Sequence, residues 1–496
     1  MLGVSIFDSY GIGWDEINER ACGNLIFNYL TSNDKTYLSH LNRYHGPAFE
    51  MLLTGIEKIA GLGSNFRAIF AVRHFITFLA FFTGIVFFYL LLEKKFNNWK
   101  ISLLGCVFLI YTPRIFADSF YNSRDIPFLS VFIISIYTLV RFLENKSIIN
   151  AILHAIASAF LFDIRIAGAI VPALTIIFTI LDLINAKQKE KLTPRIRNLF
   201  LYLFLFLCLM ILFWPILWKA PFLHLKNAFE RMAHYPFAFG VFFMGKSFQA
   251  DSLPFYYLPV WIMATVPVAY LMLFVFGIWN ALKSLSRSGF YQNNKIDIIA
   301  FLWLIIPIVN VIALKPVLYD GWRHLFFVYP AMIIWTMTGL KYLFDNVKNI
   351  LYRSFITGII IIEFLHTAGF MFRNHPHQNV YFNVIARTGR VENNFELDYW
   401  GLSYRQALEY LLKTNPGKPI KIFTENWPGY ANSYILREKD RARLVYVKDM
   451  QHADYFLTNF RWIKPPQPGR EIYSIKVDNL KIMAIYKPSI YDKNQK

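Results

Sequence analysis

The sequence predicts a polytopic α-helical membrane protein that carries a small α/β domain outside the membrane at its C-terminal end. Three observations lead to this fold class. Of the 496 residues, 56% are hydrophobic and 18% are aromatic, which is well above the composition of soluble domains. Long apolar stretches recur between residues 68 and 372, whereas residues 373–496 contain none of spanning length. We therefore expect three parts, namely an outer first loop (1–67), a transmembrane domain (68–372) and an outer α/β domain (373–496).

The transmembrane part is expected to contain about ten spans, because a helix needs about 20 apolar residues to cross a bilayer. Arg165 divides residues 148–184 into two short spans. Residues 1–10 are too short to span and lack the basic start of a signal peptide, so we expect that a first span is absent from this sequence. The expected spans are 68–92, 100–117, 126–143, 148–164, 166–184, 199–217, 258–280, 297–314, 325–343 and 355–372.

The connecting loops fall into two sets that indicate the orientation. The short set is rich in Lys and Arg, and the positive-inside rule places it in the cytoplasm. The longer set, aromatic and mixed in polarity, then faces the periplasm or its equivalent. The net charge of +19 is explained by such loops and by anionic headgroups, and no nucleic-acid-binding motif accompanies it. The short loops are 93–100, 141–146, 187–197, 283–295 and 341–353, and the longer ones are 11–67, 113–125, 218–257, 315–324 and 373–496.

The C-terminal part reads as a mixture of short strands and helices. A turn-forming cluster at residues 415–419 separates two such elements. The expected helices are 404–413, with Ser403 as its N-cap, and 429–437. The expected strands are 395–400, 420–424, 444–447, 455–458 and 482–486.

Two adjacent carboxylates, Asp15 and Glu16, begin the polar first loop. Adjacent residues of a helix point about 100° apart, so the two need not share a task. One can face a reaction centre as a general base while the other binds an orienting partner. The alternative is that both merely form the acidic first turn of a helix over residues 16–30.

Further ionisable side chains lie at the outer ends of several spans, and such groups at membrane depth are costly and tend to be functional. Each has a structural alternative: Arg165 could extend to headgroups, Arg124 and Asp125 could pair with one another, and His45 could complete a turn. Their convergence on one face is what favours a site. The substrate-binding candidates are His45, Arg124, Asp125, Arg165, Asp320, Arg323 and His324, with Asp15 and Glu16 as catalytic candidates.

This mixture of residue types has a chemical logic. Carboxylates can accept a proton from an acceptor hydroxyl, and Arg and His can hold a phosphate through charge-assisted hydrogen bonds. The patterns GxSxG, HExxH and CxxC do not occur. His375-Pro376-His377 has no obvious partners for a metal, so we expect no metal site and no cofactor. A lipid-phosphate-linked sugar fits the site, with its polyprenyl tail between apolar helices.

The arrangement resembles the membrane glycosyltransferases of the GT-C fold, which include the protein O-mannosyltransferases and the bacterial aminoarabinose transferases. That group has an Asp-Glu pair in its first outer loop, matched here by Asp15-Glu16, and two amphipathic helices, for which 16–30 and 47–60 are candidates. The resemblance implies that Asp15 is the general base and Glu16 its helper. The group also has a His-Pro-Pro-like element, which is matched loosely by His45-Gly46-Pro47.

The resemblance extends over nearly the whole chain as a topology. Many bacterial members carry a small outer C-terminal domain, and the phrases Tyr381-Phe382-Asn383 and Asp398-Tyr399-Trp400-Gly401 resemble ones found there. The departures are the missing first span and a glycine at position 46, where the group often has proline.

The function expected from these observations is an inverting transfer of a sugar from a polyprenyl-phosphate donor to a lipid, glycan or protein acceptor. We expect it at the outer face of a bacterial inner membrane, in contact with membrane lipids and not with nucleic acid. One alternative is a transporter or flippase of a lipid-linked sugar, which predicts internal repeats and charges at mid-span. Another is a scaffold whose outer domain binds partners.

Overall fold

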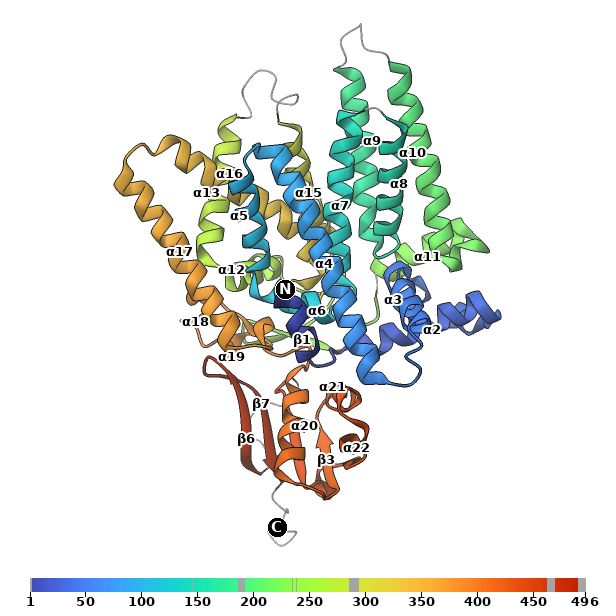
Figure 1. Ribbon diagram of the computed structural model, residues 1–496, viewed down its shortest axis with the longest axis vertical. Coiled ribbons are helices and arrows are strands. Elements are labelled where there is room, and N and C mark those ends of the chain that lie inside the picture. The colour runs from blue at the N-terminus through green and yellow to red at the C-terminus, as the bar shows by residue number, and fades with distance from the viewer. Residues whose placement is uncertain are drawn as a thin grey trace.

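The computed structural model describes residues 2–145, 147–185, 192–233, 235–237, 239–284, 294–461 and 469–488. Long helices form a bundle, and a smaller unit with a β-sheet lies at one end of it (Figure 1). The segment expected to form the first outer loop and the sheet lie toward the same end of the bundle, which is called the outer end after that expectation (Figure 1). The predicted class, a helical membrane protein with a C-terminal α/β unit, is confirmed.

Six helices of the described chain are long and apolar enough to cross a membrane, or seven if one bent pair counts as a single span. The predicted total of about ten spans is therefore not confirmed, although nearly every predicted stretch contains a helix. α8 (Ile148–Phe162) and α13 (Val268–Ser284) are apolar but shorter. The long helices are α4 (Phe66–Phe96), α7 (Asp125–Glu144), η4 with α9 (Ile166–Ala169, Ile170–Ile184), α10 (Leu192–Phe213), α15 (Lys295–Leu314) and α17 (Ile350–Arg373).

Prolines break two of the predicted spans. α5 (Trp99–Ile110) and α6 (Pro113–Tyr121) meet at 70° around Pro113, where a ring replaces the backbone N–H group. The span predicted at 258–280 is divided into α12 (Tyr257–Thr265) and α13, with Pro267 in the gap. Figure 1 shows α6 and α12 toward the end of the bundle that is nearer the sheet.

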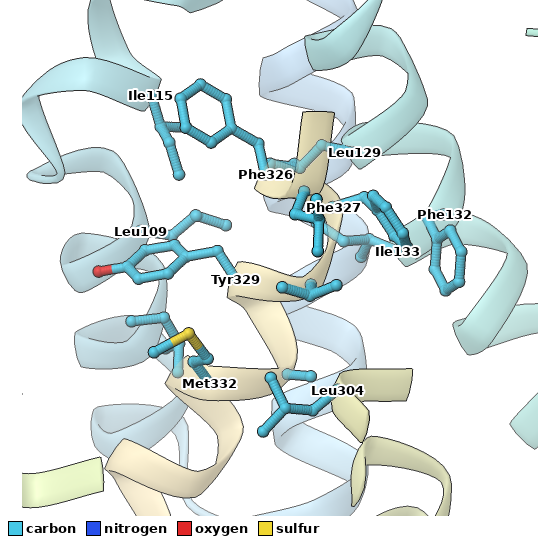
Figure 2. Close-up of a cluster of buried hydrophobic side chains, with 14 of the residues drawn as sticks. Leu109, Ile115, Leu129, Phe132, Ile133, Leu304, Phe326, Phe327, Tyr329 and Met332 are labelled. Atoms are coloured by element: carbon cyan, nitrogen blue, oxygen red, sulfur yellow. The ribbon is translucent and has the colours of Figure 1, made fainter. Parts of the chain in front are cut away.

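The centre of the bundle is formed by α16 (Tyr329–Asn346), which follows η6 (Arg323–Val328). Phe326 and Phe327 of η6 pack against α7, and the ring centroids of Phe132 and Phe327 lie 4.9 Å apart (Figure 2). Lipid tails are as apolar as these side chains, so the hydrophobic effect does not drive helices together within a bilayer. Close packing of this kind is what stabilises their association. The packing fixes η6, and with it Arg323, at the outer end of the core.

The two ends of the bundle carry different polar groups. At the end away from the sheet, lysines pair with carboxylates of neighbouring helices, as in Lys94–Glu144, Lys95–Asp297 and Lys295–Asp182. These pairs join α4, α7, α9 and α15 next to the short basic loops. Parts of the loops predicted at 141–146, 187–197 and 283–295 lie outside the described residues.

The first outer loop contains the two helices expected from the sequence. α2 (Glu16–Ser32) begins with Glu16 and Glu19 in its first turn and ends where Asn33 adopts a left-handed conformation. α3 (Ala48–Ile59) packs against α2 and buries Phe49 and Leu53. The shorter elements are α1 (Leu2–Ile6), η1 (Phe7–Ser9), η2 (Lys35–Ser39) and η3 (Leu41–Tyr44).

A later outer segment contains η5 (Pro215–Trp218), α11 (Pro221–Ala233) and a hairpin of β1 (Gly240–Phe243) and β2 (Lys246–Gln249). Residues 240–247 read Gly-Val-Phe-Phe-Met-Gly-Lys-Ser and fit the letters of a phosphate-binding P-loop. That loop requires a helix after it, whereas here a strand follows. The letters therefore mark a turn at Met244-Gly245 and no nucleotide site.

The C-terminal unit is a five-stranded mixed sheet in the order β4-β3-β5-β7-β6. β3 runs parallel to β4 and β5, and β7 runs antiparallel to β5 and β6. α20 (Ser403–Thr414) packs on the sheet with Leu408 and Leu411 buried. The strands are β3 (Ile420–Thr424), β4 (Leu444–Tyr446), β5 (Tyr455–Thr458), β6 (Arg470–Val477) and β7 (Leu480–Lys487). The short helices around them are η7 (Gln378–Val380), α18 (Val384–Arg387), α19 (Val391–Asn394), α21 (Trp427–Ala431), η8 (Asn432–Ile435), α22 (Glu438–Arg441) and η9 (Met450–His452).

Three details of this unit correct the sequence-based expectations. Residues 395–400 form no strand, and Phe395 makes only one bridge, to Phe243. Ser403 does not cap α20, because the Asp398 carboxylate accepts from the backbone N–H of Ser403 at 3.0 Å and from Gly401 at 3.1 Å. The strand at 470–477 was missed, and the helix expected at 429–437 is two short ones, α21 and η8.

Candidate active site

The turn that carries Asp15 is fixed by the C-terminal unit. Asn432 accepts from the Ile12 backbone N–H at 2.9 Å and donates to the Ile12 carbonyl at 3.0 Å. Arg405 donates to the carbonyl of Tyr10 at 2.8 Å. α2 then begins at Glu16, so Asp15 stands at the N-terminal end of a helix that points across the outer face.

Asp15 and Glu16 diverge as expected for adjacent helical residues. The Asp15 side chain is 35% exposed, and its Oδ2 accepts from Arg323 Nη2 at 3.0 Å. Glu16 is buried and faces the protein, where it accepts from the Gly13 backbone N–H at 2.6 Å and contacts His74 Nε2 at 2.9 Å. Of the pair, only Asp15 is accessible to an incoming substrate, and Glu16 connects the turn to α4.

Arg323 is the hub of the site. Its Nη1 donates to Asp125 Oδ2 at 3.1 Å, and its Nη2 donates to Asp15 and, at 3.4 Å, to Asp320 Oδ2. The guanidinium carbon lies 4.5 Å from the ring centre of Trp400 and 5.1 Å from that of Tyr319. Burial alone lowers the pKa of this group, but the surrounding carboxylates outweigh it and the pKa is raised well above its usual value. A permanently charged Arg323 therefore holds three acids from three separate segments.

Asp125 joins a second arginine to this hub. Arg165 donates to Asp125 Oδ1, while Asn122 donates to Asp125 Oδ2 at 2.9 Å. Asp125 is 2% exposed and thus shielded from water by its partners. The mutual pair of Arg124 and Asp125 considered from the sequence is wrong, since the contacts of Asp125 are with Arg165 and Arg323 and that of Arg124 is with Glu19.

Arg124 bonds instead to His45 and Glu19. Its Nη1 donates to His45 Nδ1 at 2.6 Å, which requires a neutral His45 with its proton on Nε2. Burial, together with the charge of Arg124, lowers the pKa of His45 well below the usual range. Gly46 allows this placement, because a Cβ atom there would lie 2.2 Å from the carbonyl oxygen of Asp163. That contact explains why no proline stands at position 46.

Glu19 pairs with Arg124 through Oε2 and is 8% exposed. Burial raises the pKa of Glu19 from 4.5 to about 7, against the attraction of Arg124 and with a further rise from Glu50 and Asp15. This carboxyl therefore changes its charge close to neutral pH. When it takes up a proton, Arg124 loses its anionic partner.

Asp320 and His324 complete the predicted set. Asp320 adopts a φ of 57°, and its Oδ1 accepts from Arg461 Nη2 at 2.6 Å. The His324 ring lies edge-on to Tyr319 with centroids 4.8 Å apart. Burial, followed by the charges of Arg323 and Arg165, lowers the pKa of His324 well below its usual value. Both candidate histidines are therefore neutral and can serve as hydrogen-bonding groups but not as cations.

The structure thus brings all nine predicted site residues to one end of the bundle, with Glu16 and His45 held mainly by protein partners. Sequence reasoning missed three members of the site, namely Glu19, Trp400 and Arg461. Glu19 follows Asp15 by four residues, and this spacing places both on one face of a helix. The spacing could therefore have identified Glu19 as a site residue from the sequence. Trp400 lies in a phrase that resembled the bacterial C-terminal domains. Arg461 had no local signal, because it reaches the site from the far end of the chain.

Within the described chain, these contacts join four carboxylates to four guanidinium groups. The carboxylates are Asp15, Glu19, Asp125 and Asp320, and the arginines are Arg124, Arg165, Arg323 and Arg461. An anion can bind here through guanidinium N–H groups that no carboxylate occupies, or by taking the place of a carboxylate. No group of three or more His, Cys, Asp or Glu side chains that could hold a metal occurs among the residues that the structure describes.

Comparison with known proteins agrees with this architecture. Residues 44–218 match the family model described as dolichyl-phosphate-mannose-protein mannosyltransferase, a range that includes His45, Arg124 and Arg165 but not Asp15. No protein among those with curated descriptions matches the chain.

Two solved structures share the fold over almost the whole length. Crystal structures of ArnT from Cupriavidus metallidurans match with TM-scores of 0.51, bound to undecaprenyl phosphate, and 0.50, in the apo state. Both are 11% identical to this chain. The match to the undecaprenyl phosphate complex covers 98% of this chain and 96% of the ArnT chain. The match to the apo structure covers 97% of this chain and 95% of the ArnT chain.

The chain therefore has the fold of the GT-C membrane glycosyltransferases and is an integral membrane protein. The resemblance to the group of protein O-mannosyltransferases and aminoarabinose transferases, inferred from the sequence, is confirmed.

Proposed function

We propose that this protein transfers a sugar from a polyprenyl-phosphate donor to an acceptor hydroxyl at the outer face of a bacterial inner membrane, with inversion at the anomeric carbon. The observation that carries this proposal is the contact between Asp15 and Arg323. It places an accessible carboxylate beside the buried cationic hub at the outer end of the bundle.

In the proposed reaction Asp15 is the general base. Its free Oδ1 accepts the proton of the acceptor hydroxyl while the hydroxyl oxygen attacks the anomeric carbon from the face opposite the phosphate. The bond between that carbon and the phosphate oxygen breaks, and the electron pair leaves with the lipid phosphate. No covalent sugar–enzyme intermediate forms, and Asp15 returns its proton to solvent through its exposed side.

The arginines would stabilise the charge that develops on the leaving phosphate. Arg165 and Arg124 have exposed fractions of 22% and 19% in their side chains, so both reach the surface of the site, whereas Arg323 is 2% exposed. The planar guanidinium fork binds phosphate through two parallel hydrogen bonds. A polyprenyl tail fits the apolar surface of the spanning helices, and undecaprenyl phosphate is the lipid bound in the ArnT structure.

Glu16 has a supporting task in this proposal. It holds the backbone of Gly13 and the ring of His74, and so keeps the turn before α2 against α4. The position of this backbone turn then fixes the direction of the Asp15 side chain. Glu16 is thus a positioning residue, since it touches neither Arg323 nor the accessible side of the site.

The proposal is tested by mass analysis of lipid-linked sugars in cells that lack the gene and in cells that carry either the natural chain or Asp15→Asn. We expect a polyprenyl-phosphate sugar to accumulate in the absence of the gene and to return to its normal level only with the natural chain. A flippase would instead change the side of the membrane on which that lipid accumulates and would tolerate Asp15→Asn. Equal lipid profiles in all three strains would refute the proposed donor.

A further inference from the structure

A cavity of about 310 Å³ lies between the C-terminal unit and the segment that leads into it. Residues 392–393 and 395–399 form one wall, and residues 459–461 and 479–481 form the other. Glu396, Asn459 and Arg461 are buried at its floor, whereas Glu392, Asn393 and Asn479 are exposed at its rim. None of these residues belongs to the set predicted from the sequence.

Arg461 separates this cavity from the candidate active site. On one side its guanidinium donates to the Tyr399 carbonyl at 2.6 Å. On the other it donates to Asp320 Oδ1 at 2.6 Å, and it lies 4.7 Å from the ring centre of Trp14. Asp320 is a partner of Arg323, and Trp14 immediately precedes Asp15. A molecule in the cavity would therefore be linked to the proposed base through Arg461 and the residues that it contacts, Asp320 and Trp14.

The backbone is strained on both sides of this boundary. Asp320 has a φ of 57° and Phe460, which lines the cavity next to Arg461, has a φ of 58°. Aspartate tolerates this left-handed region better than most residues, whereas for a bulky residue such as phenylalanine it is rare and unfavourable. Such strain persists where the surrounding structure requires a particular placement, commonly at ligand sites. Here it sets Arg461 between the cavity and Asp320.

The lining identifies the class of ligand. The carboxylates of Glu392 and Glu396 accept hydrogen bonds only, whereas the amides of Asn393 and Asn479 both donate and accept. Phe460 adds an aromatic surface to these polar groups. An array of this kind matches many hydroxyl groups on a compact ring. It does not suit a polyprenyl tail, because carboxylates would lose their hydration. The charges of the lining are mixed, since Lys481 and Arg461 stand beside three carboxylates, those of Glu392, Glu396 and Asp398.

We infer that this cavity binds the acceptor, and that the acceptor presents a hydroxyl-rich, sugar-like group there. The inference rests on the proposed function and adds to it the chemical class of the second substrate. The acceptor would enter from the side of the C-terminal unit while the donor lipid enters from the bundle, and Arg461 would be a positioning residue at their boundary.

The test is Asn393→Trp, which places a large ring at the rim, compared with Asn393→Gln and with Lys418→Trp, an exposed residue of the same unit outside the cavity. Undecaprenyl phosphate is the donor-side probe. We expect Asn393→Trp to bind it within about twofold of the natural protein and yet to lose at least about tenfold in transfer, with accumulation of the lipid-linked sugar in cells. Asn393→Gln and Lys418→Trp should retain both properties.

Unchanged transfer in Asn393→Trp would overturn the inference, and so would a parallel loss of transfer and undecaprenyl phosphate binding. If Asp15→Asn abolishes transfer while Asn393→Trp does not, only the acceptor cavity is refuted; if Asp15→Asn is fully active, the proposed function itself fails.

The ligand class is tested with a photo-reactive phenylalanine at position 393, which should give adducts with the mass increments of saccharide units. Adducts with peptide or with lipid alone, or a yield no higher than from the same group at position 418, would refute a sugar-like ligand.

Discussion

Glu19 makes the site sensitive to pH near neutrality. Burial raises the pKa of this carboxyl from 4.5 to about 7, and its partner in the ionised state is Arg124. The substitution Glu19→Gln preserves the shape of the side chain and removes the titration. In the natural protein an anionic Glu19 competes with a phosphate for Arg124, and in the variant that competition is absent at every pH.

The size of the effect follows from the pKa. With a value of about 7, the protonated fraction of Glu19 falls from about nine-tenths at pH 6 to about one-tenth at pH 8. If a phosphate reaches Arg124 only when Glu19 is protonated, the apparent dissociation constant rises about tenfold over that range.

The same titration affects stability. Because the pKa is higher in the folded state than its unfolded value of 4.5, the contribution is present at low pH and is lost as the pH rises through about 7. Integrated from pH 5 to pH 8, the loss in the free energy of unfolding is about 2–3 kcal/mol.

The assay is the binding of undecaprenyl phosphate to purified protein at pH 6, 7 and 8. The probe has its own titration near pH 6, so the quantity to follow is the ratio of dissociation constants between the natural protein and Glu19→Gln. We expect this ratio to rise about tenfold from pH 6 to pH 8, and the melting temperature of the variant to exceed that of the natural protein increasingly over pH 5 to 8. Glu230→Gln, an exposed outer carboxylate, is the matched control. A ratio that does not change with pH would refute the role assigned to Glu19.

Three further predictions concern the hub, its support and the orientation. Arg323→Lys keeps the charge but replaces the planar fork, whose two terminal nitrogens bind Asp125 and Asp15, with a single ammonium, so transfer should fall at least about tenfold; full activity would show that the hub is not required. Glu16→Gln should lower the melting temperature and reduce transfer less than Asp15→Asn does, and a larger loss would give Glu16 a direct role. In a variant without its native cysteines, Lys348→Cys should react with an impermeant thiol reagent only from the cytoplasm and Lys418→Cys only from outside; labelling of both from the same side would overturn the orientation.

Much of the fold was predictable because membrane spans have a strong local signal. α4, α7 and α15 lie within a few residues of their predicted stretches. The broken elements were less predictable, because hydropathy averages across a proline that ends a helix. Pro267 divides one predicted span, whereas Pro307 lies inside the continuous α15. Only packing against neighbouring helices decides between these two outcomes.

The sequence predicted which residues lie together in the site, but it did not predict which of them form ion pairs with one another. The sequence placed Asp15, Asp125 and Arg323 at outer ends of different segments, and topology alone brings such ends together. The pairing depends on packing, so the bond of Asp125 to Arg165 could not be inferred. Arg461 pairs with Asp320 across 141 positions of sequence, and such contacts have no local pattern. The neutral state of the histidines likewise follows from burial, which the sequence does not give.

The most direct test of the proposed mechanism is the rate of sugar transfer by Asp15→Asn, measured together with its affinity for undecaprenyl phosphate. Asparagine keeps the shape of the side chain and can still contact Arg323 through its amide oxygen, but it cannot accept a proton. A general base contributes about 10²–10⁴-fold, so transfer should fall by that factor while the dissociation constant stays within about threefold. Transfer at the natural rate by Asp15→Asn would contradict the assignment of Asp15 as the base.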